Sequence, residues 1–325
     1  MASHLYKHTL TGVCLLLFAM GCSPAETTTQ RDPVVSVPTP IATTAPAPMP
    51  TLGPAVQRDA VFPDVEPAIA PWYPLSQVGQ PYGQAVRGVL TFRGSPNRTY
   101  YGQGPVPDSP RVQWSYPATK MCSLSSDLEG EREWCGTGWT GQPAVWERGG
   151  ELWVAFGAYD RNVHVLDGVT GAPRMAPFPT GDLIKGSLTV DPDGHPLIYV
   201  GSRDNELRIL SFDTGELIEL WSLSAYAVDQ RLWNDDWDGA PAVIDDMMFV
   251  GGENSNFHVV ELNRGYDEQG NVTVAPLLQH AVPGWDAELL SAIGDNNVSI
   301  ESSVTIVDNV VYFANSGGLI QGWDI

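Results

Sequence analysis

The sequence predicts an all-β fold, a β-propeller of four-stranded blades, with about four blades visible in the chain. Three observations predict it: one strand–turn–strand design recurs four times, its strands alternate apolar and polar residues, and no segment has a long helical period. The polar turns fall at Asn162, Glu206, Asn256 and Gly318, with spacings of 44, 50 and 62 residues. A repeat of about 40–50 residues that carries several short strands is typical of a propeller blade.

Each repeat is expected to contain three recognisable strands. The first strand begins at a small or polar residue, and the second and third are rich in β-branched and aromatic residues on either side of a polar turn. First strands are expected at 142–145, 186–189, 240–243 and 302–305. The following strand pairs are expected at 152–156 with 163–166, 197–200 with 207–210, 248–250 with 257–260, and 310–313 with 319–322.

Residues 1–22 have the features of a lipoprotein signal peptide. Lys7 precedes the apolar run 13–20, which is too short to span a bilayer. The run ends in Gly21-Cys22-Ser23, which resembles a bacterial lipobox, and this resemblance implies that Cys22 is acylated and becomes the mature N-terminus. Ser23 resembles the residue that directs such proteins to the outer membrane. An ordinary signal cleaved near Gly21 is the alternative.

Two further segments precede the repeats. Residues 23–60 are rich in Pro, Thr and Ala, so they are expected to form a disordered, extended tether between the anchor and the folded part. Residues 61–117 are expected to hold a lead-in and a first strand, and residues 118–325 to hold the blades. The net charge of −21 makes nucleic acid and anionic membrane surfaces poor partners, so contact with a membrane is expected through the lipid alone.

The four cysteines also fit an exported protein. Cys14 lies in the signal and Cys22 is assigned to the lipid, which leaves Cys122 and Cys135, thirteen residues apart. Two remaining cysteines in an oxidising compartment favour one disulfide, which would stabilise the fold by about 3 kcal/mol. No histidine or further cysteine lies near them in the sequence, which argues against a metal site there.

Several motifs resemble the repeats of quinoprotein (PQQ-like) propellers. Segments 166–171 and 212–215, the latter with Trp221, are similar to that family's Leu-Asp-x-x-Thr-Gly…Trp motif, and segments 90–99 and 112–117 are similar to its lead-in. The resemblance covers residues 88–325. It implies a ring of seven or eight blades, so the chain would be C-terminally incomplete. The alternative is a closed four-bladed ring in which 112–116 supplies the last strand.

Loops that lead into first strands crowd one face of a propeller, and here they carry charged and aromatic residues. Stacked around one axis, these loops predict a binding site at the channel mouth. The alternative is that the Trp residues pack between blades while the acidic residues are solvated. The candidate residues are Trp139, Gln142, Lys185, Asp236, Trp237, Asp238 and Glu301.

The family resemblance also indicates which residues would be needed to bind a cofactor. Quinoprotein dehydrogenases stack PQQ on a Trp, often under a disulfide of adjacent cysteines, and hold Ca²⁺ with Glu, Asn and Asp oxygens. This sequence has no adjacent cysteines and no matching ligand column, so no cofactor is expected. Calcium held by Asp235, Asp236 and Asp238 is a separate possibility, because hard oxygen ligands suit it, although their spacing matches no EF-hand.

The sequence therefore favours an exported, lipid-anchored propeller that acts as a non-catalytic binding or assembly scaffold. The resemblance extends to the propeller lipoproteins of outer-membrane protein assembly, which implies an outer-membrane lipoprotein facing the periplasm or the cell surface. A protein partner or a polymer ligand is expected at the propeller loops. The alternatives are a PQQ-dependent dehydrogenase of alcohols or sugars and a carbohydrate-binding surface protein.

Overall fold

The computed structural model describes residues 71–102, 104–127, 130–138 and 140–325. The chain divides into two units, Met1–Val65 and Glu66–Ile325, and every described residue belongs to the second. The signal peptide with Cys22, the tether 23–60 and Trp139 lie outside the described residues. None of the described helices is long and apolar enough to cross a bilayer.

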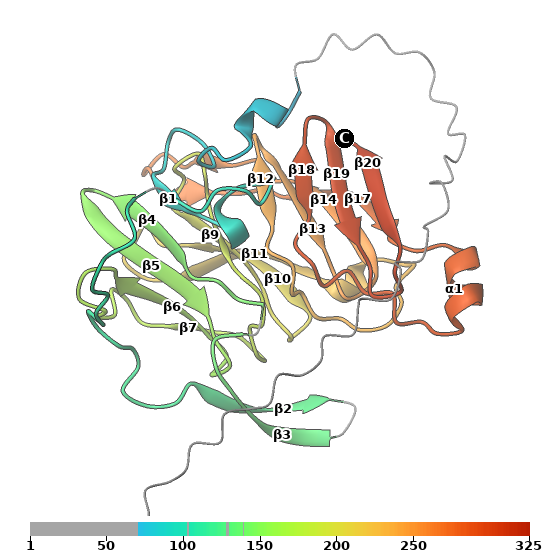
Figure 1. Cartoon of the computed structure of the whole chain (residues 1–325), viewed down its shortest axis with the longest axis horizontal. Helices are drawn as coiled ribbons and strands as arrows, with labels where there is room; N and C mark the ends of the chain where they lie inside the picture. Colours follow the sequence, from blue (N-terminus) through green and yellow to red (C-terminus); the bar gives the residue numbers. More distant parts are fainter. Residues whose placement is uncertain (1–70, 103, 128–129, 139) are drawn as a thin grey trace, which may run out of the picture. The chain divides into compact units, whose positions relative to one another are not determined.

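The described fold is all-β, as predicted, and consists of successive antiparallel sheets (Figure 1). The first sheet contains β1 (Gly88–Val89), β4 (Ala144–Arg148), β5 (Glu151–Gly157), β6 (Asn162–Asp167) and β7 (Phe178–Pro179). The second contains β8 (Thr189–Val190), β9 (Leu197–Gly201), β10 (Glu206–Ser211) and β11 (Ile218–Ser224). The third contains β12 (Ala242–Ile244), β13 (Met247–Gly251), β14 (Asn256–Glu261) and β17 (Leu277–Pro283), and the fourth contains β18 (Thr305–Val307), β19 (Val310–Ala314) and β20 (Ile320–Asp324).

The remaining elements are short. Two hairpins stand apart from the four sheets: β2 (Cys122–Asp127) with β3 (Gly130–Cys135), and β15 (Gly265–Tyr266) with β16 (Val272–Thr273). The β15–β16 hairpin lies between β14 and β17 of the third repeat and contributes to the 62-residue spacing that follows Asn256. The helical elements are η1 (Leu75–Gln77), η2 (Phe92–Gly94), η3 (Ala225–Ala227) and α1 (Ala287–Ile293). Asp286 begins α1 by accepting a hydrogen bond from Leu289 N, and Gly294 ends it in the left-handed conformation.

This arrangement fits the predicted propeller. Every predicted second and third strand is present within one or two residues of its expected bounds, and in each sheet these strands pair directly. The first strands begin two or three residues later than expected, because the preceding backbone groups bond to the neighbouring repeat instead. Gln142 N donates to Ser187 Oγ at 2.8 Å, and Ala240 N donates to Ser303 Oγ at 2.9 Å. Within the described residues the sheets do not close into a ring.

The closed four-bladed alternative is wrong about residues 112–116. These residues form no strand and do not pair with the fourth sheet. Trp114 instead packs on the first sheet, where its Nε1 donates to the carbonyl of Gly168 at 3.1 Å and its ring lies against Gly171. An aromatic side chain with an apolar surface beside it gains more from this packing than from an exposed edge position.

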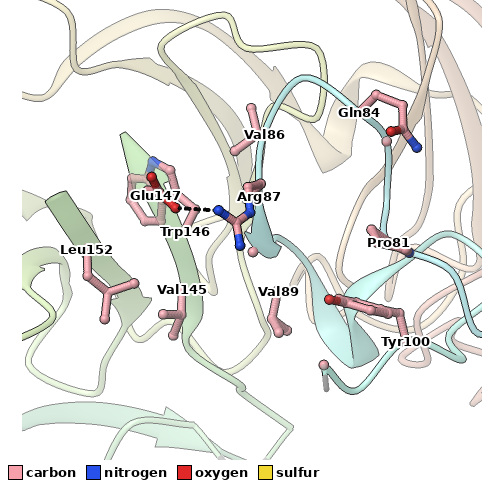
Figure 2. Close-up of a pocket in the computed structure, with 13 residues that line it drawn as sticks. Pro81, Gln84, Val86, Arg87, Val89, Tyr100, Val145, Trp146, Glu147 and Leu152 are labelled. Atoms are coloured by element: carbon pink, nitrogen blue, oxygen red, sulfur yellow. Dashed lines mark hydrogen bonds and ion pairs between the residues drawn. The ribbon is translucent and has the colours of Figure 1, made fainter. Parts of the chain in front are cut away.

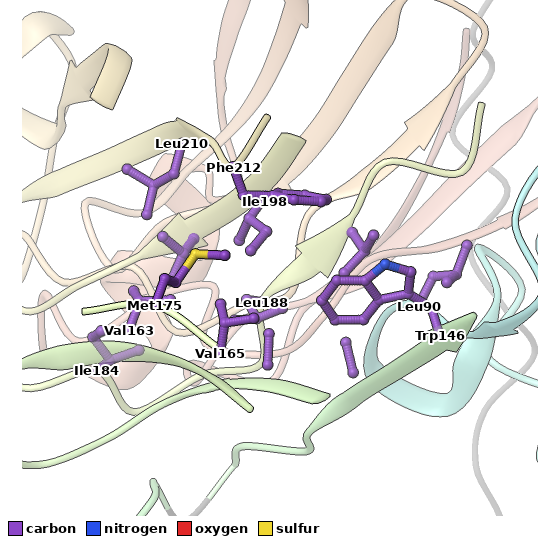
Figure 3. Packing of buried hydrophobic residues seen from close by; sticks show 14 of the residues in the cluster. Leu90, Trp146, Val163, Val165, Met175, Ile184, Leu188, Ile198, Leu210 and Phe212 are labelled. Carbon is purple, nitrogen blue, oxygen red and sulfur yellow. The ribbon is translucent and has the colours of Figure 1, made fainter. Parts of the chain in front are cut away.

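Successive sheets pack face to face through buried apolar side chains. Trp146, Leu188, Ile198 and Phe212 join the first and second sheets, with Trp146 and Phe212 ring centroids 5.8 Å apart (Figure 3). A separate buried cluster, which includes Tyr199, Val243 and Met248, joins the second and third sheets. A further one, which includes Phe249, Phe257 and Phe313, joins the third and fourth. Each fully buried large side chain contributes about 1.5–3 kcal/mol, so these seams hold the sheets in order.

Residues 88–99, which include the segment 90–99 predicted as part of the lead-in, contact the first, second and fourth sheets and the residue Ala240 just before the third. Strand β1 pairs with β4 of the first sheet. Val190 N of the second sheet donates to Leu90 O at 2.8 Å, and Ile306 N of the fourth donates to Pro96 O at 3.0 Å. Arg98 reaches Ala240 O, just before the third sheet, at 3.0 Å and Val304 O, just before the fourth, at 2.8 Å. The lead-in therefore ties the first strands of the repeats together.

Candidate functional site

One backbone hydrogen bond recurs in all four repeats and defines a common end of the sheets, here called the turn face. In each repeat the second residue after the end of the second strand donates its N–H to a loop that precedes the first strand. The four bonds, each 2.9 Å long, join Tyr159 to Gly136, Arg203 to Leu183, Glu253 to Asp236, and Ser316 to Ser299. Gly138, Lys185, Asp238 and Glu301 each lie two residues beyond these acceptors, so they occupy equivalent positions.

A buried charge cluster lies on the turn face where the second and third repeats meet. The ammonium of Lys185 is 2.8 Å from Asp236 Oδ2 and 2.9 Å from Asp238 Oδ2. Its third partner is Glu253, whose Oε1 is 2.8 Å from Nζ and whose Oε2 accepts a hydrogen bond from Asn234 at 2.8 Å. Arg203 Nε approaches Asp236 at 3.4 Å. Asp236 is only 1% exposed and Glu253 only 3%, so water screens these interactions little.

Burial and pairing shift the protonation of this cluster. Burial raises the pKa of Asp236 to about 7 and that of Asp238 well above its usual range, in both cases against the opposing field of Lys185. Burial also acts to raise the pKa of Glu253, but Lys185 and hydrogen bonds from Asp238 and Asn234 hold it below its ordinary value. The Lys185 ammonium thus joins three buried carboxyl groups whose pKa values are shifted in opposite directions.

A pocket of about 420 Å³ opens beside the charge cluster. Ser126 and Asp127, from the end of β2, line one part of it, while Arg203, Asn234 and Glu253 connect it to the cluster. Its aromatic member is Trp233, which is 43% exposed. We call it the Trp233 pocket, and its lining residues are Ser126, Asp127, Arg203, Trp233, Asn234 and Glu253.

The backbone holds Trp233 in place on both sides. Leu232 N donates to Asn254 O at 3.1 Å, and Asn234 N donates to Glu253 O at 3.3 Å. Between these two bonds Trp233 has a φ of 68°, a left-handed conformation that costs a bulky residue on the order of 1 kcal/mol or more. The fold thus sustains backbone strain at an exposed indole, which is common at binding sites.

The sequence-predicted residues have different surroundings. Lys185, Asp236 and Asp238 meet in the charge cluster, whereas Glu301 accepts a hydrogen bond from Ser299 at 2.8 Å. Gln142 accepts one from Arg93 N at 3.1 Å. Trp237 is 1% exposed, packs between the second and third sheets, and donates through Nε1 to Asn205 O at 3.0 Å.

Sequence reasoning missed Glu253, Arg203, Asn234 and Trp233. A signal for the first two exists, because Arg203 and Glu253 occupy the same position after the second strand in neighbouring repeats. Their opposite charges at matching positions predict a contact zone between those repeats. Nothing in the local sequence shows that Trp233 is held outward, because that depends on bonds to residues 253 and 254.

The geometry permits a test of the cofactors that the family resemblance implied. Carboxylate oxygens of Asp236, Asp238 and Glu253 lie within 4.8 Å of one another, but the Lys185 ammonium contacts all three, where a Ca²⁺ ion would sit. Asp235 accepts a hydrogen bond from the Tyr226 hydroxyl and is not part of this group. Trp237 has no free face for a PQQ ring. These residues do not fit Ca²⁺ or PQQ.

The disulfide closes the β2–β3 hairpin at the end opposite to Ser126 and Asp127, which line the Trp233 pocket. Cys122 and Cys135 are bonded, as expected, and face each other at the base of the β2–β3 hairpin. Trp134 on this hairpin donates through Nε1 to Ser125 O at 3.1 Å, and the Arg132 guanidinium lies 4.1 Å from its ring centre. The disulfide therefore fixes the hairpin whose end supplies Ser126 and Asp127 to the pocket.

Another pocket, of about 590 Å³, lies between the lead-in and β4 (Figure 2). Val89, Val145 and Leu152 contribute apolar surface, and Arg87 pairs with Glu147 at 3.3 Å. Arg87 is highly exposed, so this ion pair is worth little in water. The pocket includes none of the residues of the charge cluster.

No protein-family model matches the chain, and no curated protein matches it. Among solved structures, the chain is similar to BamB from Moraxella catarrhalis, with 16% identity and a TM-score of 0.37, over 62% of this chain and 55% of that one. It is also similar to the computationally designed protein Ika4, with 18% identity and a TM-score of 0.36, over 53% of this chain and 85% of that one. It is similar as well to the computationally designed protein Ika8, with 16% identity and a TM-score of 0.37, over 64% of this chain and 57% of that one. The chain thus spans a little over half the length of BamB and Ika8.

Proposed function

We propose that the chain is an exported β-propeller that acts as a non-catalytic binding scaffold, and that its partner binds on the turn face around Trp233. The observation that carries this proposal is the exposed Trp233, held on strained backbone between two hydrogen bonds and beside a polar pocket. Rigid aromatic residues next to hydrogen-bonding groups are the usual anchors of binding surfaces.

In this proposal the charge cluster has a structural role and not a catalytic one. A general base needs an ionised group that is free to take a proton from a substrate. Lys185 already contacts all three carboxyl groups, and Glu253, the one whose pKa is held low, also accepts a hydrogen bond from Asn234. The cluster then serves to fix the loops that position Trp233.

Photo-crosslinking tests the binding surface. Asp229 is exposed on the same loop as Trp233, so replacing it with benzoylphenylalanine in the full chain should give a covalent adduct in cells that export the protein. The same replacement at Glu216, exposed in the turn at the other end of the second sheet, is the control. We expect an adduct from position 229 only, and expect Trp233→Ala to abolish it. Absence of an adduct at position 229, or equal adducts at both positions, would refute the proposed surface.

A thermal shift experiment tests the enzyme alternative. We expect the melting temperature of the purified full chain to stay unchanged when PQQ and Ca²⁺ are added together. The reason is that a ligand raises the melting temperature only if the native state binds it, and Lys185 already fills the space between the carboxylates. An increase that Asp238→Ala or Glu301→Ala removes would favour the dehydrogenase.

We also propose that Cys22 carries a lipid that anchors the protein in the outer membrane. Cys22→Ala should move the protein from the membrane fraction to the soluble fraction, because the acyl chains would be the part inserted in the bilayer. Ser23→Ala keeps the acceptor thiol and serves as the matched control, which should stay in the membrane fraction. Immunoblots of separated fractions give the readout, and a Cys22→Ala protein that remains membrane-bound would contradict the anchor.

A further inference from the structure

Trp233 borders two hollows, not one. The Trp233 pocket lies on one side, and a smaller hollow of about 200 Å³ also contains Trp233 and Asn234. Tyr226, Arg231, Leu232 and Asp235 complete the smaller one. An extended ligand that passes over Trp233 would therefore place successive units in the two hollows.

The charged side chains that line the Trp233 pocket, the larger of the two hollows, are paired with opposite charges within the protein. Asp127 pairs with Arg132 at 2.7 Å, and Glu253 pairs with Lys185 at 2.8 Å. Arg203 pairs with the buried Asp236 at 3.4 Å. A charged ligand would have to break one of these pairs, whereas a neutral ligand leaves all of them intact.

The smaller hollow carries one acidic and one basic side chain, Asp235 and Arg231, so its formal charges cancel. The Tyr226 hydroxyl donates to Asp235, and the Arg231 guanidinium donates to Tyr226 O at 3.2 Å while lying 5.0 Å from the Tyr226 ring centre. The chain as a whole has a net charge of −21, which further disfavours an anionic ligand.

The uncharged groups that line the two hollows combine flat aromatic rings with side chains that form hydrogen bonds. The exposed rings of Trp233 and Tyr226 offer apolar faces, while Ser126 and Asn234 can both donate and accept hydrogen bonds. A sugar ring has the complementary surface, because its C–H groups form an apolar face and its hydroxyls both donate and accept. Since the backbone on both sides of Trp233 is already held by hydrogen bonds, binding would cost little backbone entropy.

We propose that these two hollows bind a neutral saccharide chain, with successive sugar units on either side of Trp233. This inference rests on the proposed function, because it names the ligand class of the same surface. A basic peptide is the competing ligand, and the test separates the two.

Calorimetric titration of the full chain with linear neutral hexasaccharides provides the test. The probes are the β-1,4-glucose, α-1,4-glucose, β-1,4-mannose and β-1,4-N-acetylglucosamine hexamers. We expect at least one to bind, and to bind at least about tenfold more tightly than its monosaccharide, because only the chain fills both hollows. Trp233→Ala should weaken binding at least about tenfold, as expected for an aromatic anchor.

Two variants control for indirect effects. Trp323, an exposed tryptophan on β20, lies outside both hollows, so Trp323→Ala should leave saccharide affinity unchanged. Trp233→Phe keeps an aromatic face and should retain part of the affinity even if Trp233→Ala folds poorly.

The inference fails if no hexasaccharide binds at concentrations up to about 1 mM, or if Trp323→Ala weakens binding as much as Trp233→Ala. The crosslinking experiment distinguishes this failure from failure of the proposed function. An adduct at position 229 that mass spectrometry identifies as a peptide of another protein, without saccharide binding, keeps the scaffold and rejects the saccharide, whereas no adduct and no saccharide binding rejects both.

Discussion

Replacing Lys185 with methionine should lower the free energy of unfolding by about 3–5 kcal/mol, the cost of leaving buried carboxylates without their cation. Lys185 contacts three carboxylates within 2.9 Å, and Arg203, at 3.4 Å from Asp236, can replace only part of that interaction. Methionine keeps most of the side-chain volume, so loss of charge dominates the effect. Urea denaturation of the wild type and the variant gives the measurement.

This loss should depend on pH in a defined direction. Carboxylates in the unfolded chain ionise near pH 4, whereas burial without Lys185 keeps the pKa values of Asp236 and Asp238 raised in the folded state. The folded state then binds more protons than the unfolded state, so stability falls as pH rises. The deficit of Lys185→Met should be smaller at about pH 5 than at about pH 8.

A matched control and a rescue complete the design. Lys120 is exposed, so Lys120→Met should change stability by less than about 0.5 kcal/mol. Adding Asp236→Asn and Glu253→Gln to Lys185→Met should recover part of the loss, because both removed charges are buried partners of Lys185. A Lys185→Met protein as stable as wild type at both pH values would mean that the cluster is not a buried ion-pair network.

The second large effect is expected at Arg98. Arg98→Met should lower the free energy of unfolding by about 3–5 kcal/mol, because buried oxygens left without a donor cost about 1–3 kcal/mol each. The guanidinium, 6% exposed, donates to the carbonyls of Phe92, Ala240 and Val304 and to the hydroxyl of Thr91. Burial lowers the pKa of Arg98 to about 10, so it stays protonated at neutral pH.

Arg87→Met is the matched control, because Arg87 lies on the same segment but is exposed and pairs only at the surface with Glu147. Its expected cost is within about 1 kcal/mol. Thermal unfolding followed by circular dichroism would compare the two variants. Equal stabilities of Arg98→Met and Arg87→Met would show that the lead-in does not hold the sheets together.

The hairpins were predictable because their signal is local. The apolar run from Leu197 to Val200 is buried on both faces, residues Glu206 to Ile209 alternate half-buried with buried side chains, and the intervening polar turn favours their pairing. The disulfide between Cys122 and Cys135 could be predicted because the other two cysteines, Cys14 and Cys22, were assigned to the signal and to the lipid. The sequence also placed Lys185 and Asp238 in loops that lead into neighbouring first strands, and the structure brings these two side chains together.

The rest of the site depends on how the repeats stack. Asp236 and Trp237 are neighbours in sequence, yet one joins the charge cluster and the other packs between sheets, because the chain is extended there and successive side chains point opposite ways. Trp233 is exposed only because Leu232 and Asn234 bond to a turn of the same repeat. Such tertiary contacts leave no periodic trace in the sequence.

The lead-in has a consequence for the order in which the protein assembles during synthesis. Leu90 and Arg98 leave the ribosome before any of the sheets they join, but Arg98 meets Val304 across 206 residues. The last bond of the lead-in, from Ile306 N to Pro96 O, cannot form until the fourth sheet has been made. Until then Pro96 O and the Arg98 guanidinium lack their partners in and just before the fourth sheet, so the hairpins that form earlier are not yet tied together by the lead-in. Contacts of such long sequence separation slow folding, and the partly assembled chain exposes apolar surface until they form.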